Sequence, residues 1–458
     1  MKSSFNLPFI KWLFCGGILL SSFSACQKET QQPVKNEEIA TVPNSNQQGH
    51  LHQTKTYSST VAQNWLDMQL RNLRLPAGPN IFGLNGHRYF GYSAIALYES
   101  VVPGMPGYQS LHGQLTDMPE MPATEPGKTY HWPTCANAAL AYMNKNFFTI
   151  NVSSMDSLEN ALNQEYQSDP DVDAAEFTRS VNFGKTVAQR IFDWSKTDGA
   201  STVYPPYTPL GPGFWAPTPP NFPAPLGPYW GNNRLMVQGS LTGTESPAPP
   251  VYSTDPNSAY FAMVKEVYDV SLTLTADQIA TGLYFRDNPG YASGTHYVHT
   301  FNDIMHNENP QLDSYAVAMA KLGIVFNASF IGCWKLKYFY NQDRPIRYIR
   351  EVMGHTAWNP LFNTPGIPDF PSGHSQNAGA FSTVMTSLLG ENYSFTLHTY
   401  DYLGMTPRHY NSFYEMAEDV GRARVYAGIH YKYSCVEGNK QGKKIAQNVL
   451  NILKFEKE

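Results

Sequence analysis

Apolar residues recur at three- and four-residue spacing through most of the chain, which is the period of an α-helix. This pattern predicts helices over residues 57–75, 81–101, 131–148, 154–167, 172–198, 258–283, 310–342 and 374–390, another from about 411, and a last one over 436–454. No stretch shows a marked strand-like alternation, and no unit repeats at the period of a solenoid. The fold class expected from the pattern is therefore all-α.

Residues 200–256 interrupt the helical pattern. Ten prolines fall between Pro205 and Pro228, a density that no helix or central strand tolerates. Trp215 and Trp230 lie in the same stretch, and such large aromatic side chains argue against a flexible linker. We expect a long ordered connection between two helical-bundle halves, residues 56–199 and 257–458.

Length and charge narrow the class of protein. A chain of 458 residues can bury a large core, and its net charge of −5 gives no reason to expect a nucleic-acid partner. The basic residues that carry chemistry are local rather than spread over a surface.

The N-terminus resembles a bacterial lipoprotein signal peptide over residues 1–25. Two lysines precede an apolar run from Trp12 to Leu20, and small residues lead to Cys26. Cys26 is then the lipidated first residue of the mature protein, and residues 26–55 form a polar tether. We expect an exported, membrane-anchored protein on the periplasmic or cell-surface side, held by the lipid alone, with an ordinary secretory signal as the alternative. No later apolar run looks long enough to span a bilayer.

Three cysteines remain in the predicted mature chain besides Cys26, namely Cys135, Cys333 and Cys435. An odd number leaves at least one free thiol in an oxidising compartment. Their spacing matches no cysteine metal site, and a disulfide scaffold is not indicated.

Three segments in the last third of the chain offer more hydrogen-bond donors than a structural site needs. They are Lys337 with Arg344-Pro345, the run Pro371-Ser372-Gly373-His374, and Arg424 with Gly428 and His430. Guanidinium, ammonium, hydroxyl and backbone donors together suit a compact oxyanion with several oxygens.

These segments resemble the signature of the vanadium-dependent haloperoxidase and type-2 phosphatidic acid phosphatase superfamily, K-x(6)-RP, PSGH and SR-x(3)-GxH. The first two parts match fully, and the third has Ala423 where the family usually has Ser. The match spans residues 337–430 and is thinner elsewhere. Soluble haloperoxidases are built from two helical bundles, which agrees with the predicted fold.

The resemblance implies a role for each residue. The residues that bind the oxyanion are Lys337, Arg344, Ser372, Gly373 and Arg424. His430 is either the axial ligand to vanadium or a phosphorylated nucleophile. His374 is expected to transfer protons. The leading interpretation is a haloperoxidase that uses vanadate to oxidise halide with hydrogen peroxide, with Lys337 polarising the bound peroxide.

Local chemistry makes these roles plausible. Pro345 biases Arg344 toward an extended backbone, away from the helix surface. The PSGH turn feeds a helix, whose N-terminus favours an anion, although an isolated Ser372 would by default be read as a helix cap. Six residues separate Arg424 from His430, so we expect a helix break near Gly428 that lets both face the pocket. Arg422 competes for the arginine role, but the spacing favours Arg424.

Two departures concern the partners of these residues. Family members often carry Asp four residues after the ligand His, whereas this chain has Ser434, which leaves the partner of His430 open. Asp343 precedes Arg344 and could neutralise part of its charge.

Asp287 resembles a haloperoxidase acid that contacts a site arginine, although a helix-capping or surface role is the commoner one for such an Asp. His296, His299 and His306 are interpreted as ordinary histidines.

Two alternatives remain open at the level of sequence. The same pocket suits an acid phosphatase in which His430 attacks phosphorus and water releases the phosphohistidine. A surface lipoprotein that only binds phosphate-bearing ligands would need no turnover. The halide, the organic acceptor, the phosphoester and the oligomeric state are not encoded in these patterns.

The N-terminal reading predicts an acylated peptide that begins at Cys26. Mass spectrometry of the native protein checks it, because lipidation follows cleavage between Ala25 and Cys26. An unmodified peptide spanning this bond would contradict the prediction.

Overall fold

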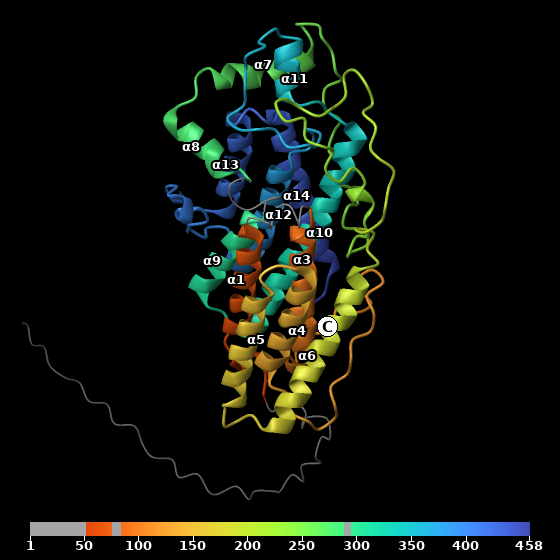
Figure 1. Cartoon of the computed structure of the whole chain (residues 1–458), viewed down its shortest axis with the longest axis vertical. Coiled ribbons are helices and arrows are strands. Elements are labelled where there is room, and N and C mark those ends of the chain that lie inside the picture. Colours follow the sequence, from red (N-terminus) through yellow and green to blue (C-terminus); the bar gives the residue numbers. More distant parts are fainter. Residues whose placement is uncertain (1–51, 76–83, 288–294) are drawn as a thin grey trace, which may run out of the picture. The chain divides into compact units, whose positions relative to one another are not determined.

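The computed structural model describes residues 52–75, 84–287 and 295–458 (Figure 1). All of these residues belong to one compact unit. The predicted signal peptide, Cys26 and most of the tether lie outside the described residues. The described end of the tether packs on the fold, since the Trp132 indole donates to the carbonyl of His52.

The first half forms the helices that its apolar periodicity predicts. They are α1 (Thr60–Arg74), α3 (Asn85–Val101), α4 (Trp132–Phe147), α5 (Val152–Gln167) and α6 (Ala174–Ser195). Short 3-10 turns add η1 (Thr54–Thr56) and η2 (Val102–Gly104). Asp173 caps α6 by accepting from the backbone N–H of Glu176, which satisfies a donor that the first helical turn leaves open.

The second half contains more elements than predicted. Its helices are α7 (Ala259–Ser271), α8 (Ala276–Tyr284), α9 (His296–Glu308), α10 (Leu312–Tyr340), α11 (Pro345–Glu351), α12 (Gly373–Leu389), α13 (Phe413–Tyr426) and α14 (Lys432–Ile452). The single helix expected over 258–283 is two helices, because Thr275 and Gln278 form a capping box that starts α8. Neither α9 nor α11 was predicted.

Strand is confined to one small hairpin in the described residues. Strand β1 (Phe395–Leu397) pairs antiparallel with β2 (Arg408–Tyr410), and the turn η5 (Asp401–Leu403) lies between them. The hairpin lies between α12 and α13 in the sequence, so the all-α prediction is confirmed with this local exception.

Helix α10 links the two groups of helices, since it contacts α3 of the first half and α12 and α14 of the second (Figure 1). Its length and composition would allow it to cross a membrane, which corrects the sequence-based statement about later apolar runs. However, 94 % of its apolar window is buried inside the protein, as in the core helix of a globular fold. Gly323 on α10 faces Gly91 on α3, and an added Cβ would lie 2.9 Å from the opposite Cα.

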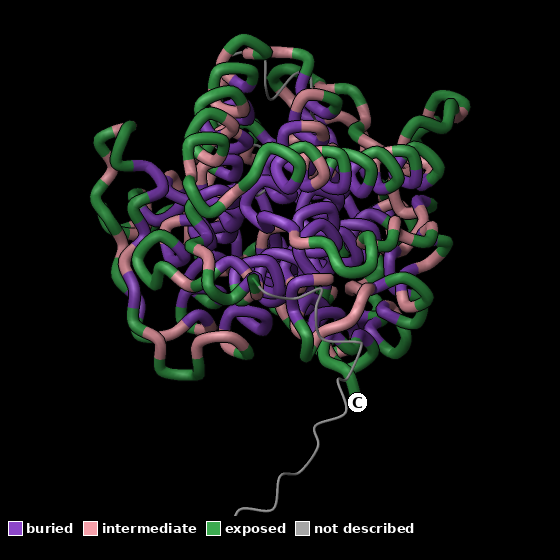
Figure 2. Tube along the Cα trace, turned by 90° about the horizontal axis from the view of Figure 1, so that it is seen from below, coloured by how far each residue is buried: buried purple, intermediate pink, exposed green. Residues whose placement is uncertain are grey.

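Buried residues from both halves form one continuous hydrophobic core (Figure 2). A smaller apolar cluster lies beside the end of α10 and contains Leu84, Phe330, Cys333, Trp334 and Ile367. Among the residues that the structure describes, Cys135, Cys333 and Cys435 are buried and carry free thiols.

The proline-rich connection lies on the fold as an ordered chain with only the 3-10 turn η3 (Trp230–Asn232). The N–H of Trp215 donates to the carbonyl of Asn341, and the N–H of Leu226 donates to that of Gly366. The predicted connection therefore packs against the loop that precedes α11 and the loop that follows it.

Glycines let α12 and α14 approach so closely that their backbones touch. A Cβ on Gly442 would overlap the carbonyl of Gln376, and one on Gly379 would overlap that of Asn439. A Cβ on Gly438 would lie 2.7 Å from the carbonyl oxygen of Ser372. This contact fixes the start of α12 against α14.

Gly442→Ala is predicted to destabilise the fold by about 1–3 kcal/mol, the usual cost of overpacking a tight contact. Chemical denaturation measures the change in the free energy of unfolding. Gly107→Ala is the control, because an added Cβ there meets nothing within 4 Å. Equal stability of the two variants would contradict the close approach of α12 and α14.

Candidate functional site

The first motif spans the loop between α10 and α11. Lys337 lies in the last turn of α10, and Asn341 ends the helix with φ +51°. Arg344 is the N-cap of α11 with φ −86° and ψ 151°, and Pro345 occupies the first helical position. The predicted effect of Pro345 is thus confirmed, because Arg344 is extended and points away from the helix surface. Lys335, two residues before Lys337, is exposed.

The second motif forms the N-terminus of α12. Ser372 is the N-cap, and its hydroxyl oxygen accepts from the backbone N–H of Ser375. The hydroxyl proton of Ser372 remains available as a donor, so the cap and the ligand roles are compatible. A Cβ on Gly373 would lie 3.6–3.9 Å from Cys333, Trp334 and Lys337, which are ordinary contacts. Packing therefore does not require glycine there, whereas close approach of a ligand would.

The third motif contains the break that the spacing predicts. Helix α13 ends at Tyr426, Gly428 has φ +75°, and α14 begins at Lys432. Arg424 is 2 % exposed and His430 is 3 % exposed, so both point inward. Arg422 instead pairs with Asp419 at 3.3 Å in a half-exposed position, which supports the choice of Arg424.

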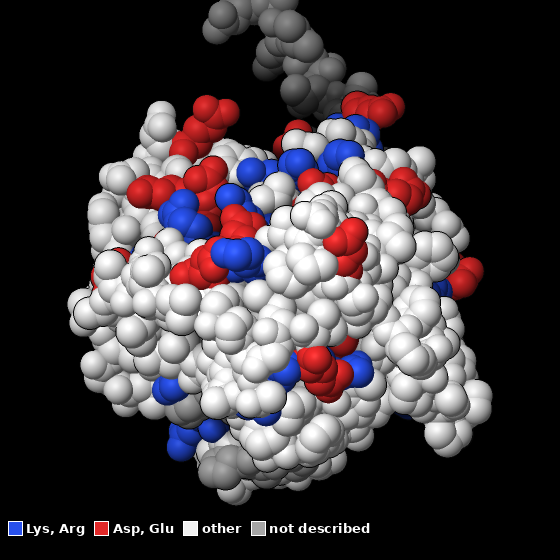
Figure 3. All heavy atoms as spheres, turned by 90° about the horizontal axis from the view of Figure 1, so that it is seen from above, with Lys and Arg blue, Asp and Glu red and all other residues white. Residues whose placement is uncertain are grey.

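The motif cations are buried. Lys337 and Arg344 are 0 % exposed, whereas the face seen in Figure 3 shows lysines and arginines mixed with acidic side chains. The Lys337 ammonium donates to the carbonyls of Pro368 (2.9 Å), Asp369 (3.0 Å) and Pro371 (2.6 Å). Lys337 thus fixes the segment that leads into Ser372.

Both arginines retain a buried donor without an acceptor among the described residues. Arg344 donates to the carbonyls of Ile367 (2.8 Å) and Ile429 (2.6 Å), and Arg424 donates to that of Phe285. Arg344 Nη2 and Arg424 Nε have no hydrogen-bond partner. Unpaired donors on buried cations are costly, so these atoms indicate the place of an anion.

His430 faces a carboxylate that the sequence did not reveal. Its Nδ1 lies 3.0 Å from Asp369 Oδ1, and its Nε2 lies 3.1 Å from Arg344 Nη1. The hydroxyl of Ser434 donates to Asp369 Oδ2. The partner of His430 is therefore Asp369, which precedes the PSGH run.

Burial, more than the neighbouring charges, shifts the pKa values of the titratable groups in the pocket. Burial lowers the pKa of Lys337 to about 8 and that of Arg344 to about 10. Burial, together with Arg344 and Lys337, lowers the pKa of His430 well below its ordinary value. Burial also raises the pKa of Asp369 to about 6, against the attraction of Arg344. A bound anion would offset part of the cost of burying Lys337 and Arg344.

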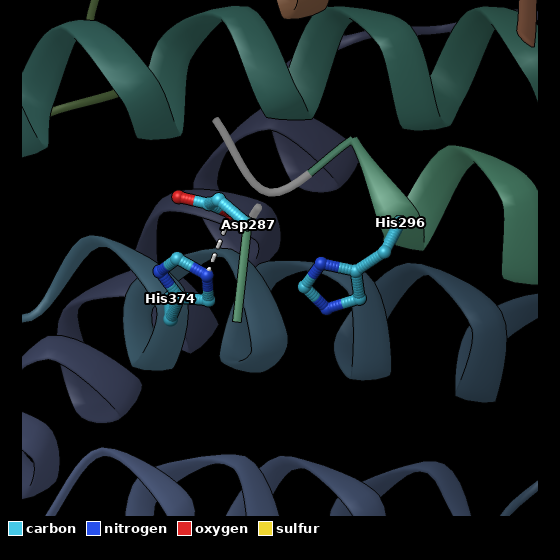
Figure 4. A group of neighbouring side chains, drawn as sticks. All are labelled: Asp287, His296 and His374. Atoms are coloured by element: carbon cyan, nitrogen blue, oxygen red, sulfur yellow. Dashed lines mark ion pairs between the residues drawn. The ribbon is translucent and has the colours of Figure 1, made fainter. Parts of the chain in front are cut away.

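A second cluster lies behind His374 and contains Asp287 and His296 (Figure 4). His374 Nε2 lies 3.0 Å from Asp287 Oδ1, and the ring of His296 lies 5.8 Å from that of His374. The ligand atoms of the three residues lie within 4.8 Å of one another, and two imidazoles with a carboxylate are also a ligand set for a divalent transition metal. The direct His374–Asp287 contact makes an acid–base pair the simpler interpretation.

Electrostatics around Asp287 link this cluster to Arg424. Burial favours the neutral carboxyl, but His374 and Arg424 outweigh it and hold the pKa of Asp287 below its usual range. The resemblance pairs an acid at the position of Asp287 with a site arginine, although a capping or surface role was the commoner expectation. Here the influence of Asp287 on Arg424 is electrostatic, and the close partner of Asp287 is His374.

Two buried histidines, His296 and His87, were not among the site residues predicted from the sequence. His296, interpreted from the sequence as an ordinary histidine, is 2 % exposed, and both of its ring nitrogens lack a hydrogen-bond partner in the described residues. His87 comes from α3, lies 3.4 Å from Asn377 Nδ2 through its Nε2, and has its pKa lowered to about 3 by burial. Only the run before His296 carried a signal, through its weak resemblance to a haloperoxidase segment.

The remaining sequence candidates pair with residues outside the pocket. His299 lies 3.1 Å from Asp303, and His306 lies 3.3 Å from Asp67. Asp343 accepts from the backbone N–H of Arg344 but pairs with the side chain of Arg347 at 3.2 Å. The expectation that Asp343 neutralises the Arg344 guanidinium is therefore wrong.

Comparisons with known proteins agree with this geometry. Residues 317–456 match the family model of the VCPO second helical-bundle domain. A crystal structure described as the first bacterial vanadium-dependent iodoperoxidase superposes with a TM-score of 0.80 and 28 % identity, covering 88 % of this chain and 98 % of that one. No curated protein sequence matches.

More distant structures share the fold. Those of a bacterial vanadium-dependent chloroperoxidase have TM-scores of 0.62 in the apo form and 0.61 in the holo form, at 15 % and 14 % identity. They cover 80 % and 90 % of this chain, and 93 % and 94 % of their own. The domain match and the similarity to the iodoperoxidase structure confirm the resemblance to the vanadium-dependent haloperoxidase and type-2 phosphatidic acid phosphatase superfamily that the motifs carry.

Proposed function

We propose that the protein is a vanadium-dependent haloperoxidase that oxidises halide with hydrogen peroxide. The observation that carries the proposal is the pair of buried guanidinium donors without acceptors, Arg344 Nη2 and Arg424 Nε, next to His430. The overall similarity to an iodoperoxidase structure favours halide chemistry over phosphoester hydrolysis. Iodide is accordingly the first halide to test.

The donor set fits vanadate. Arg344 and Arg424 would bind its oxygens through their free N–H groups, and Ser372 and Gly373 would add a hydroxyl and a backbone N–H at the N-terminus of α12. His430 would bind the metal through a ring nitrogen. Bound vanadate supplies the activation of hydrogen peroxide toward halide.

His374 is the residue suited to move protons. Its Nε2 lies next to Asp287, which stabilises the protonated ring, while burial and Arg424 favour the neutral ring. Burial and Arg424 outweigh Asp287, so the pKa of His374 is lowered and the neutral ring, which can accept a proton, is favoured. Lys337 differs from the two arginines in having no unpaired N–H, because its ammonium donates to three carbonyls. One of these N–H groups would have to turn toward the ligand to contact it.

Arg344→Ala and Arg424→Ala are each predicted to weaken orthovanadate binding by at least about tenfold, since a charge-assisted hydrogen bond contributes about 1.5–3 kcal/mol. Calorimetry measures the affinity, and phosphate should compete for the same site. Arg422→Ala is the matched control, because Arg422 is half-exposed and pairs with Asp419. Unchanged affinity in Arg424→Ala with loss in Arg422→Ala would contradict the assignment.

Lys337→Ala separates support of the loop from chemistry. If the ammonium polarises a reacting oxygen, iodide and bromide oxidation at saturating vanadate should fall by about 10²–10³-fold, the scale for one preorganised donor. If Lys337 only holds residues 368–371, thermal stability and vanadate affinity should fall while turnover of the loaded enzyme persists. Lys335→Ala is the control, since Lys335 is exposed on the same helix.

The same assays decide between peroxidase and phosphatase. Absence of halide oxidation in the vanadate-loaded wild-type protein, together with phosphoester hydrolysis that vanadate inhibits, would replace the haloperoxidase proposal with the phosphatase. Absence of both activities, with oxyanion binding retained, would indicate a binding protein.

A further inference from the structure

The carboxylate beside His430 comes from a position that the superfamily signature does not predict. Relatives often carry Asp four residues after this histidine, where this chain has Ser434. Here Asp369 Oδ1 lies 3.0 Å from His430 Nδ1, and the Ser434 hydroxyl donates to the other carboxylate oxygen. Asp369 and Ser434 are both 0 % exposed.

The surroundings of His430 determine which ring nitrogen carries the proton. Arg344 Nη1 lies 3.1 Å from Nε2 and 3.4 Å from Nδ1, but a guanidinium can only donate. Nε2 must therefore offer its lone pair to Arg344. Among the described residues, Asp369 Oδ1 makes no aligned hydrogen bond, but His430 Nδ1 lies 3.0 Å from it and is closer than Arg344 Nη1 at 3.8 Å, so a small rotation of the ring would let Nδ1 donate to it. The neutral ring is then protonated at Nδ1, and a ligand that binds through Nε2 would take over the lone pair that Arg344 contacts.

Asp369 is held by the same elements that build the oxyanion pocket. Its N–H donates to the carbonyl of Gln342, and its own carbonyl accepts from Lys337. The Ser434 hydroxyl, in the first turn of α14, donates to its carboxylate. Its position is therefore fixed by the loop after α10 and by the start of α14.

We propose that Asp369 and Ser434 act together as the positioning pair that sets the tautomer of His430, in place of a single aspartate at position 434. Asp369 accepts the proton of Nδ1, and Ser434 orients Asp369. These roles of Asp369 and Ser434 rest on the oxyanion pocket of the proposed function, but they do not depend on the oxidation of halide. Partners of this kind fix ring orientation and are worth about 10–100-fold in metal affinity.

The tautomer can be measured in the unmodified protein. Histidine labelled with ¹⁵N in the ring, observed by NMR without vanadate, should show His430 protonated at Nδ1 and unprotonated at Nε2. His430→Gln identifies the signal by its loss. A wild-type ring protonated at Nε2 would overturn the proposal without any substitution at Asp369.

Substitutions then test each member. In Asp369→Ser, His430 should no longer be protonated at Nδ1 alone but should give a mixture of the two tautomers. Vanadate binding should weaken by about 10–100-fold. Ser434→Ala should have a smaller effect in the same direction, because Asp369 stays in reach but loses its orienting donor. Asp343→Asn is the matched control, since this buried acid is next to Arg344 yet pairs with Arg347, and it should leave the tautomer unchanged.

The exchanged pair provides a rescue. The double variant Asp369→Ser with Ser434→Asp exchanges the two side chains of the Ser434–Asp369 hydrogen bond. Compared with Asp369→Ser alone, it should bind vanadate more tightly and should again show His430 protonated at Nδ1. A double variant no better than that single one, or Asp369→Ser with wild-type tautomer and affinity, would overturn the proposal. A wild-type protein that fails to bind vanadate contradicts the proposed function instead, and the tautomer measurement still decides this inference.

Discussion

The constraint on which the site depends is the burial of three cations next to one another. Lys337, Arg344 and Arg424 are at most 2 % exposed, and an isolated buried charge costs far more than a fold can spare. Backbone carbonyls offset most of this cost, three of them at Lys337 and two at Arg344. The donors that remain unpaired are those that an oxyanion would satisfy, so the chemistry of the site follows from an electrostatic imbalance that the fold maintains.

Close helix packing keeps this imbalance in place. The N–H of Ser372 donates to the carbonyl of Ser434 at 3.0 Å, which joins the start of α12 to the first turn of α14. Gly438 allows this approach because a Cβ there would crowd the carbonyl of Ser372. The turn that presents Ser372 and the helix that follows His430 are thus fixed relative to each other by backbone contacts, which side-chain motion does not loosen. Rigidity of this kind is what preorganised donors require.

Sequence reasoning succeeded where the cause is local. The helical periodicity, the extended Arg344 before Pro345 and the break at Gly428 all follow from the residues at or next to those positions. The split between α7 and α8 was also readable, since Thr275 and Gln278 have the spacing of a capping box.

Residues that act through tertiary contacts could not be found in this way. Asp369 reaches His430 only because the loop before α12 folds against the start of α14, and no spacing rule connects the two. His87 comes from the other half of the chain, through the packing of α3 on α10. His296 resembles many core histidines in sequence, and only its unpartnered ring beside His374 distinguishes it.

Two histidine–carboxylate pairs divide the work of the pocket through their surroundings. His430 has Asp369 on one ring nitrogen, but burial and the nearby cations keep its ring neutral, which suits a ligand or a nucleophile. His374 has Asp287 beside it, and this carboxylate opposes burial and Arg424, so the pKa of His374 is lowered less than that of His430. Titratable groups whose environments differ in this manner are typical of acid–base assignments in enzymes. The two imidazoles have the same chemistry in the sequence, and the placement of Asp369 and Asp287 is what gives them different functions.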